Sequence, residues 1–290
     1  MSNAAVMPPE RELLSAADIA ETRRHPGFRA AVEAYCAANL TRYHALAPIE
    51  RWMVSDTGRA SLSATVLVLD ATTGLTPAAL GGAVVVTSGE VSRGRARLYL
   101  QRAVANGLIE PVDPGARLTR DAALRPSPRL HAVMVGVLRL AVRYAATLAP
   151  EAAPAVPRLD DPAFMRRAAI YVGAITPGLK QFFPLDSPVQ LFQARDGGSR
   201  VLEELVTRQH PGRERLLQTC AYSHSALARA SLCSRTHVIQ LLRDVEARGY
   251  VRLGPRSLTI TPELSNDAEQ YYAGAFTIAR TAAAWALAES

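Results

Sequence analysis

SRTHVIQLLRDVEARGYV, residues 234–251, is the stretch of sequence that decides the fold. Val238, Leu242 and Val245 recur at helical spacing, so one face of the helix that they predict should be buried. Ser234-Arg235 opens this helix. Gly249 can adopt the left-handed conformation that closes a helix. The stretch therefore predicts a helix that begins and ends at defined residues and then passes into a strand.

The neighbouring residues extend this helix into a larger pattern. Residues 225–230 favour a shorter helix, and residues 231–233 form the tight turn between the two. Residues 250–260 are expected to form a β-hairpin that turns at Gly254-Pro255. Two helices joined by a tight turn and followed by a hairpin are typical of a winged helix-turn-helix.

The same pattern occurs earlier in the chain. Residues 92–109 match residues 234–251 at an offset of 142, with a stripe of Ala96, Leu100 and Ala103, and the Leu-Thr pair at 118–119 recurs at 258–259. Upstream, the residue types at positions 56, 58 and 62 recur at 196, 198 and 202. Offsets that drift by a few residues are expected when loops change length after a tandem duplication. The sequence thus predicts two related halves in one chain.

The two copies are expected to differ in their turns. Leu80 aligns with Leu227 at an offset of 147, five more than the helix that follows. This predicts a turn in the first copy, around residues 86–91, that is five residues longer. In the first hairpin, Asp113-Pro114-Gly115 favours a tight turn with a return strand over residues 117–119.

The predicted fold is mainly α-helical with small β-hairpin wings. It consists of tandem winged helix-turn-helix repeats, whose flanking dimerisation-type helices (28–44, 128–148, 164–175 and 267–288) pack together as an intrachain pseudo-dimer. Residues 1–24 are expected to be a polar arm with a short helix over 11–22. The predicted halves cover residues 25–148 and 161–290. The linker between them, 149–160, contains three prolines and is expected to be extended and semi-rigid.

The positive charge lies on the repeated motif. The chain has a net charge of +7, while residues 91–130 and 222–262 carry +5 and +4, so the rest is slightly negative. Localised basic charge indicates a surface for phosphate, and polar side chains on an exposed helix can contact base edges in a major groove. We therefore predict binding to double-stranded DNA. The candidate DNA-binding residues are Ser92, Arg93, Arg95, Arg97, Arg102, Arg117, Arg120, Ser234, Arg235, Thr236, His237, Gln240, Arg243 and Arg256.

Each half resembles the MarR family of bacterial transcription regulators in the order of its elements. The matching pattern in the second half is Ala226-Leu227-Ala228, Ser234-Arg235, Val238, Leu242, Glu246, Gly249-Tyr250-Val251 and Leu258-Thr259. The resemblance implies a sequence-specific regulator, often a repressor relieved by a small-molecule effector. The family's pockets lie between the flanking helices and the winged domain. By this resemblance, the candidate pocket residues are Tyr35, Tyr43, Trp52 and Tyr171, although a core role is commoner for aromatic side chains.

The chain departs from the family pattern, and other functions fit a winged helix-turn-helix as well. Both copies share one chain, whereas the family typically forms a dimer of single copies, and the second hairpin is short. A protein-docking winged helix and a tandem winged-helix replication initiator remain alternatives. No nucleotide-binding glycine pattern or nucleophile motif is present, so neither an enzyme nor a bound cofactor is expected.

The histidines and cysteines suggest a zinc site or a reactive thiol only weakly. Cys220, His224, Cys233 and His237 are plausible zinc-ligand types, but buried thiols are the preferred interpretation, and no metal is predicted. Cys233 precedes a helix start, which can lower a thiol pKa, yet a small core residue is commoner. Three cysteines, no apolar run of spanning length and no evident signal peptide favour a cytoplasmic protein without a membrane partner.

Overall fold

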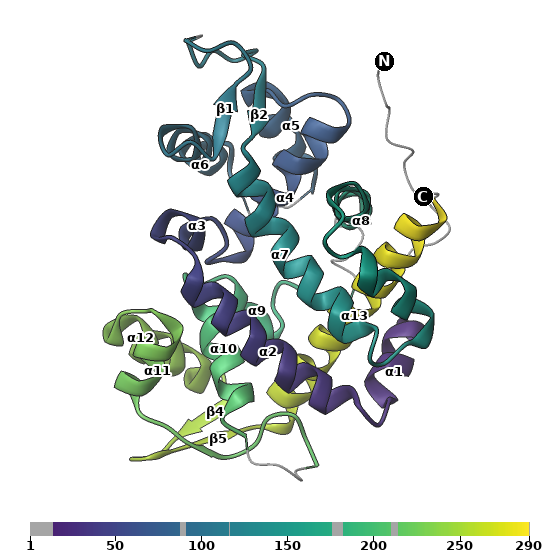
Figure 1. Cartoon of the computed structure of the whole chain (residues 1–290). Helices are drawn as coiled ribbons and strands as arrows, with labels where there is room; N and C mark the ends of the chain where they lie inside the picture. The colour runs from purple at the N-terminus through teal and green to yellow at the C-terminus, as the bar shows by residue number, and fades with distance from the viewer. Residues whose placement is uncertain (1–13, 88–90, 116, 176–181, 210–213, 290) are drawn as a thin grey trace.

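The computed structural model describes residues 14–87, 91–115, 117–175, 182–209 and 214–289. The protein is mainly helical, with two small antiparallel sheets (Figure 1). The elements outside the repeated motif are α1 (Ala16–Arg24), α2 (Phe28–Ala45), α3 (Pro48–Met53), α7 (Pro128–Ala145), the 3-10 helix η2 (Pro150–Arg158), α8 (Pro162–Ile175), α9 (Pro188–Gln193) and α13 (Pro262–Ala288).

The repeated motif forms two units of helices followed by a hairpin. The first unit contains α4 (Thr57–Ala71), α5 (Pro77–Thr87), α6 (Arg93–Ala105), β1 (Ile109–Pro111) and β2 (Leu124–Pro126). The second contains α10 (Gly198–Thr207), β3 (Cys220–Ala221), α11 (His224–Ser231), α12 (Arg235–Ala247), β4 (Val251–Leu253) and β5 (Ser257–Ile260).

Both hairpins are antiparallel, and each sheet gains a third segment. Ile109 pairs with Pro126 in the first unit, and Val251 pairs with Ile260 in the second. In the second unit β3 adds to the outer side of β5, with Cys220 opposite Leu258. A single bridge between Leu75 and Leu124 occupies the corresponding place in the first unit.

Local chemistry sets the ends of α6 and α12, as the sequence predicted. The hydroxyls of Ser92 and Ser234 accept hydrogen bonds from the backbone amides of Arg95 and His237, the third residue of each helix, at 3.1 Å in both copies. Gly107 and Gly249 follow the helices with φ of +65° and +80°, a conformation that costs glycine little. The same short signals therefore start and stop both helices.

The predicted apolar stripes are buried. Ala96, Leu100 and Ala103 are at most 3% exposed, and Val238, Leu242 and Val245 are fully buried. Tyr99 and Leu241, at matching positions, complete the two stripes with 1% exposure each. Each helix thus buries one face against its own unit and leaves the opposite face to solvent.

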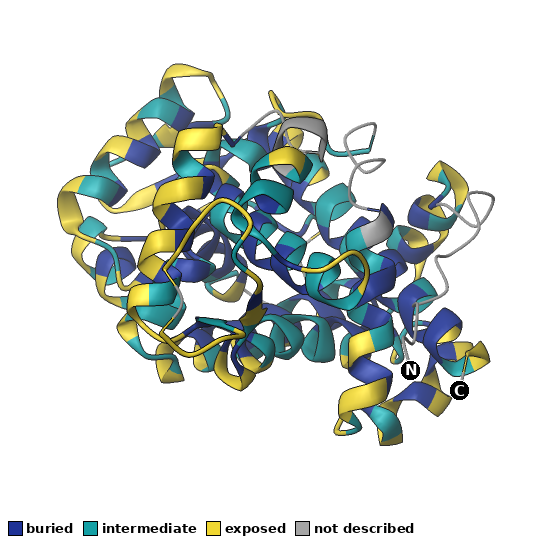
Figure 2. Ribbon diagram, turned by 90° about the horizontal axis from the view of Figure 1, so that it is seen from above, coloured by how far each residue is buried: buried dark blue, intermediate teal, exposed yellow. Residues whose placement is uncertain are grey.

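The buried hydrophobic residues form two cores. Figure 2 shows buried residues in dark blue along the inner parts of the helices. The smaller core belongs to the first unit and contains Met53, Leu62, Tyr99 and Leu130. The larger core combines the second unit with α1, α2, α7, α8 and α13. Within it α13 packs on α7 and α8, and α2 packs on α7 and α10. The four flanking helices therefore pack together, with α2 and α7 lying in the core of the second unit.

Two expectations about connecting segments were wrong. Residues 149–160 are not extended: Pro150–Arg158 forms a 3-10 helix with Ala152 and Ala155 buried, because the small alanines fit against α7 and α13. The return strand of the first hairpin is not 117–119 but β2, because Leu124 fits into the first core whereas Leu118 stays 40% exposed. The first hairpin consequently carries a long connection between β1 and β2, residues 112–115 and 117–123 of which are described.

Two further expectations were partly right. Residues 1–13 of the predicted arm lie outside the described residues. The following helix, α1, packs on α13 with Ile19 fully buried, so this part of the arm belongs to the core. The five extra residues of the first copy do not all lie in its turn. Helix α5 has 11 residues against 8 in α11, and the rest lengthen the connection, of which residues 88–90 lie outside the described ones.

Candidate nucleic-acid interface

The solvent-facing side of α12 presents polar side chains in a row. Thr236, Gln240 and Arg243 are exposed and lie opposite the buried stripe of Val238 and Leu242. Gln240 donates a 2.8 Å hydrogen bond to Asp244, one turn further along the helix. Asp244 is in turn an ion-pair partner of Arg195. The row therefore carries an amide, a hydroxyl and a guanidinium, which are groups able to contact base edges and phosphates.

His237 does not belong to this row, although the sequence placed it there. Its ring is half-buried, and its Nε2 atom is shielded from solvent without a hydrogen-bond partner among the described residues. The helical turn explains the difference, because position 237 lies on the flank of α12 next to the second unit's own core. Arg235 and the hairpin residue Arg256 are exposed, as expected.

The positive charge around this face affects a nearby histidine. His224 begins α11 and its ring lies edge-on to Tyr222, with centroids 5.2 Å apart. Partial burial lowers the pKa of His224, and the positive charges of Arg235 and Arg243 lower it further. The two arginines therefore produce a positive potential at the junction of α11 and α12.

The solvent-facing side of α6 differs from that of α12. Gly94, Leu98 and Gln101 occupy the outward positions, and Leu98 is 67% exposed. The arginines of α6 lie on its two flanks. Arg93 and Arg97 are exposed on the flank next to α5 and make no hydrogen bond or ion pair with other described residues. Sequence reasoning missed Leu98 and Gln101, although the offset of 142 aligns them with Gln240 and Arg243.

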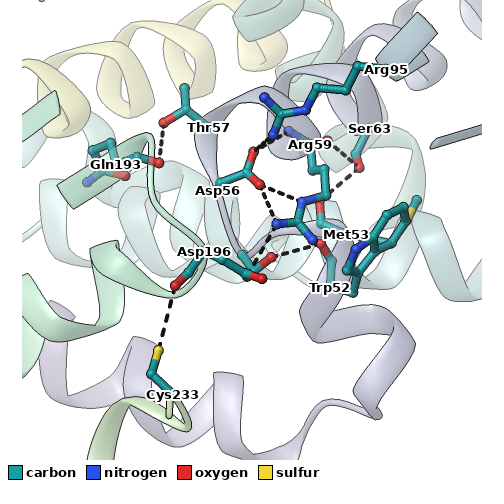
Figure 3. A network of polar contacts seen from close by, with 11 residues as sticks. Trp52, Met53, Asp56, Thr57, Arg59, Ser63, Arg95, Gln193, Asp196 and Cys233 are labelled. Carbon is teal, nitrogen blue, oxygen red and sulfur yellow. Dashed lines mark hydrogen bonds and ion pairs between the residues drawn. The ribbon is translucent and has the colours of Figure 1, made fainter. Parts of the chain in front are cut away.

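On the other flank Arg95 is held inside the protein's own ion-pair network (Figure 3). Its guanidinium lies 2.6 Å from Asp56, the N-cap residue of α4, whose carboxylate is 3% exposed. Arg59 lies between two acids, at 2.5 Å from Asp56 and 3.3 Å from Asp196. In the unbound protein Arg95 is therefore engaged by Asp56, and its role as a DNA contact stays a prediction.

The same network joins the two units. The Gly197 amide donates a 2.7 Å hydrogen bond to the Ser55 carbonyl, and the Thr57 hydroxyl donates one of 2.9 Å to the Gln193 carbonyl (Figure 3). These contacts connect the N-terminus of α4 with that of α10, its counterpart in the repeat. Corresponding parts of the two copies therefore meet directly.

Arg102 also has a partner within the protein. Its guanidinium lies 4.2 Å from the centre of the Trp52 ring, and Arg59 lies 5.1 Å from the same centre. Trp52 stacks on Tyr99 with ring centroids 5.9 Å apart, and the Tyr99 hydroxyl bonds Ser63 at 2.7 Å. The structure thus uses Trp52 as a platform for two arginines.

Of the other three aromatic residues predicted for a pocket, Tyr35 and Tyr171 lie in the larger core, and Tyr43 is buried without belonging to that core. Tyr35 contacts Tyr144, Tyr272 and Phe276 edge-on, and burial raises its pKa well above the ordinary value. Tyr43 lies under Arg200, and Tyr171 packs on Trp285. None of the four residues lines the cavity beside α5 and α6 or the smaller cavity beside α1, η2 and α13.

The remaining predicted DNA contacts lie at the helix starts and in the loop of the first hairpin. Ser92 and Ser234 are exposed and serve as helix caps. Arg117 and Arg120 are exposed in the loop of the first hairpin, where the Arg120 carbonyl accepts a 2.9 Å hydrogen bond from the Ala78 amide. That contact fastens the loop onto the start of α5.

The cysteines and histidines do not form a cluster. Among the described residues, no three His, Cys, Asp or Glu side chains are close enough to hold a metal ion. Cys233 lies against the Asp196 and Ser231 carbonyls, and burial raises the pKa of its thiol, opposite to the lowering that a helix start can cause.

Neither a membrane-spanning helix nor a similar known protein is found. In the described part of the chain, no helix combines the length and apolar character needed to cross a membrane. Comparison with protein families, curated proteins and solved structures finds no match to this chain.

Proposed function

We propose that this protein is a sequence-specific regulator of transcription that binds double-stranded DNA through two winged helix-turn-helix units in one chain. The observation that carries the proposal is the exposed row of Thr236, Gln240 and Arg243 on α12, together with the exposed arginines Arg235 and Arg256. A polar helix face next to a basic hairpin is the arrangement in which such units place a helix in the major groove and a wing on the backbone.

The duplicated architecture supports a single-chain pseudo-dimer. Packing among α2, α7, α8 and α13 joins the flanking helices of both halves, as the dimerisation helices of MarR-like proteins do between chains. The contacts of Ser55 with Gly197 and of Thr57 with Gln193 add a second junction. By the resemblance to that family, we propose a repressor whose binding responds to a small-molecule effector.

The two units differ in the side chains that they can offer to DNA. In α12 the polar row of Thr236, Gln240 and Arg243 is exposed, with Gln240 bonded to Asp244 of the same helix. In α6 the outward positions are a glycine, a leucine and a glutamine, while Arg93 and Arg97 lie on one flank. We propose that the second unit reads sequence and that the first unit mainly contacts phosphates.

The first test is selection of bound fragments from genomic DNA, followed by fluorescence anisotropy on the recovered site. Gln240→Ala is expected to weaken binding to that site by about 1–3 kcal/mol while leaving binding to random duplex nearly unchanged. Arg143→Ala on α7 is the matched control, because it removes an exposed charge far along the chain from both motifs. Equal losses on specific and random DNA would show that Gln240 contacts only the backbone.

The second test concerns stoichiometry. One chain is expected to bind one operator with half-sites about one helical turn apart, because both reading helices are already joined. The half-sites should differ, with the sequence preference mainly in the one under the second unit, since Gly94, Leu98 and Gln101 of α6 stand where α12 has Thr236, Gln240 and Arg243. Light scattering of the complex measures this directly. Two chains on identical half-sites would contradict the pseudo-dimer and leave DNA binding intact.

One observation favours a second candidate function. Leu98, 67% exposed at the centre of the outward face of α6, is an apolar anchor of the type found in protein interfaces. A winged-helix module that docks another protein would use Leu98 and would show little dependence on salt. The salt titration described in the Discussion separates this candidate from DNA binding.

A further inference from the structure

The first unit contains a cavity, and the second unit has different residues at several of the positions that line it. The cavity has a volume of about 610 Å³ and lies between α5, α6 and the long hairpin loop, the elements at the top of Figure 1. This volume falls within the range of small-molecule sites, which is roughly 300–1,000 Å³. It is much more than one phosphate group needs.

The floor of the cavity is apolar. Leu80 and Leu100 line it together with the consecutive glycines Gly81 and Gly82. A Cβ atom added at either glycine would meet no atom within 4 Å. Glycine inside a helix costs about 1 kcal/mol relative to alanine, and here no close packing requires it. The two missing side chains therefore leave open space above the floor.

The rim of the cavity is positive. Arg93, Arg97 and Arg120 line it, and no aspartate or glutamate does so among the described residues. These three side chains form no hydrogen bond or ion pair within the described part of the chain, unlike Arg95 and Arg102 on the opposite flank of α6. Arg120 reaches the site because the loop is fastened to α5 by the bond between the Arg120 carbonyl and the Ala78 amide, 2.9 Å long.

The second unit provides an internal comparison. At the positions of Gly81, Gly82 and Arg97 it has Ala228, Arg229 and Ile239. Its hairpin connection covers only residues 254–256, whereas the first covers 112–123. Three independent departures between the copies, in α5, in α6 and in the loop, thus all act on the same space. Each one either opens the cavity or adds a cation to its rim.

We propose that this cavity binds a small amphipathic anion, a molecule with an aromatic or aliphatic body and a carboxylate, sulfonate or phosphate group. The body would lie on Leu80, Leu100 and the two glycines, and the anionic group would be held by Arg93, Arg97 and Arg120. DNA backbone fits less well, because it has no apolar body to cover the floor.

Occupancy of the cavity has a consequence for DNA. Arg93 and Arg97 are among the cations that we assign to phosphate contacts, so the anion and DNA compete for the same side chains. This consequence rests on the proposed function, whereas the site itself does not.

The binding experiment uses the whole protein and anilinonaphthalene sulfonate, an amphipathic anion whose fluorescence rises in apolar surroundings. Saturable binding of one probe per chain is expected. Arg97→Ile, which installs the residue of the second copy, should weaken it about tenfold through loss of a charge-assisted contact. Gly81→Leu fills the floor and should weaken it at least as much. Because leucine favours helix and meets open space, this variant should fold.

Arg125→Ala is the control variant. It removes one exposed arginine of the same unit, on β2 and outside the cavity. Unchanged binding in this variant together with weakened binding in the other two supports the site. The site is overturned if the wild type shows no saturable binding of the probe. It is also overturned if Arg97→Ile and Gly81→Leu bind the probe with the same affinity as the wild type.

A separate titration of the probe into the protein–DNA complex tests the competition. Release of DNA by the wild type but not by Gly81→Leu supports shared use of the arginines. Binding of the probe without release of DNA overturns the competition and leaves the site standing. If the protein binds no DNA at all, the proposed function fails while the fluorescence experiment still decides the site.

Discussion

Replacing Glu203 by alanine is expected to lower the free energy of unfolding by about 3–5 kcal/mol, because a buried cation then loses its counter-charge. Glu203 and Arg200 lie one turn apart on α10 with side chains only 5% and 10% exposed, and their charged atoms are 3.0 Å apart. Asn39 of α2 donates a 2.8 Å hydrogen bond to the same carboxylate oxygen. The carboxylate therefore links α10 to α2 inside the larger core.

A second arginine increases the effect. Arg42 of α2 bonds the Asn39 amide oxygen at 3.1 Å, and burial together with the charge of Arg200 lowers the pKa of Arg42. Without Glu203, two buried guanidinium groups would repel each other with no acid between them. Urea denaturation of the variant and the wild type measures the loss.

Two comparison variants make this prediction specific. Glu110→Ala breaks an ion pair of 3.4 Å with Arg125 whose members are 43% and 58% exposed, so a change below about 1 kcal/mol is expected. The double variant Arg200→Met with Glu203→Leu removes both charges and should recover much of the stability. A Glu203→Ala protein as stable as Glu110→Ala would show that the buried pair contributes nothing.

The second large effect is expected from salt. Raising the salt from about 50 mM to about 200 mM should weaken DNA binding by roughly 10³-fold if about six cations contact phosphates. Arginines that lie exposed on the two motifs without a side-chain partner among the described residues supply this number. They include the predicted DNA contacts Arg93, Arg97, Arg117, Arg120, Arg235, Arg243 and Arg256.

Anisotropy titrations at several salt concentrations give the slope of log affinity against log salt, expected on the order of −5. Arg93→Ala should make the slope less steep by about one, because it removes one phosphate contact. Arg143→Ala, the control from α7, should leave the slope unchanged. A slope near zero in the wild type would contradict DNA binding through phosphate contacts and favour protein docking through Leu98.

The sequence by itself determined the local elements of the motif. Ser92 and Ser234 at the helix starts, Gly107 and Gly249 as closing residues, and the stripes ending at Ala103 and Val245 all act within a few residues. Their energies depend on short-range hydrogen bonds and on the helical repeat, so reading the chain in order is enough to find them. The internal duplication supports the prediction of these helices, because the same signals occur at matching positions in both copies.

Only the tertiary structure decided which side chains are free to act. Arg95 is engaged by Asp56, 39 residues away in sequence, and Arg102 by Trp52, so two predicted DNA contacts have partners that no local pattern reveals. The proline-containing stretch 150–158 packs as a 3-10 helix because α7 and α13 offer a surface for its alanines. The cavity beside α5 likewise needs a loop from far along the chain to bring Arg120 to Arg97. Such contacts depend on how distant segments meet, and this is the part of the site that composition and periodicity leave open.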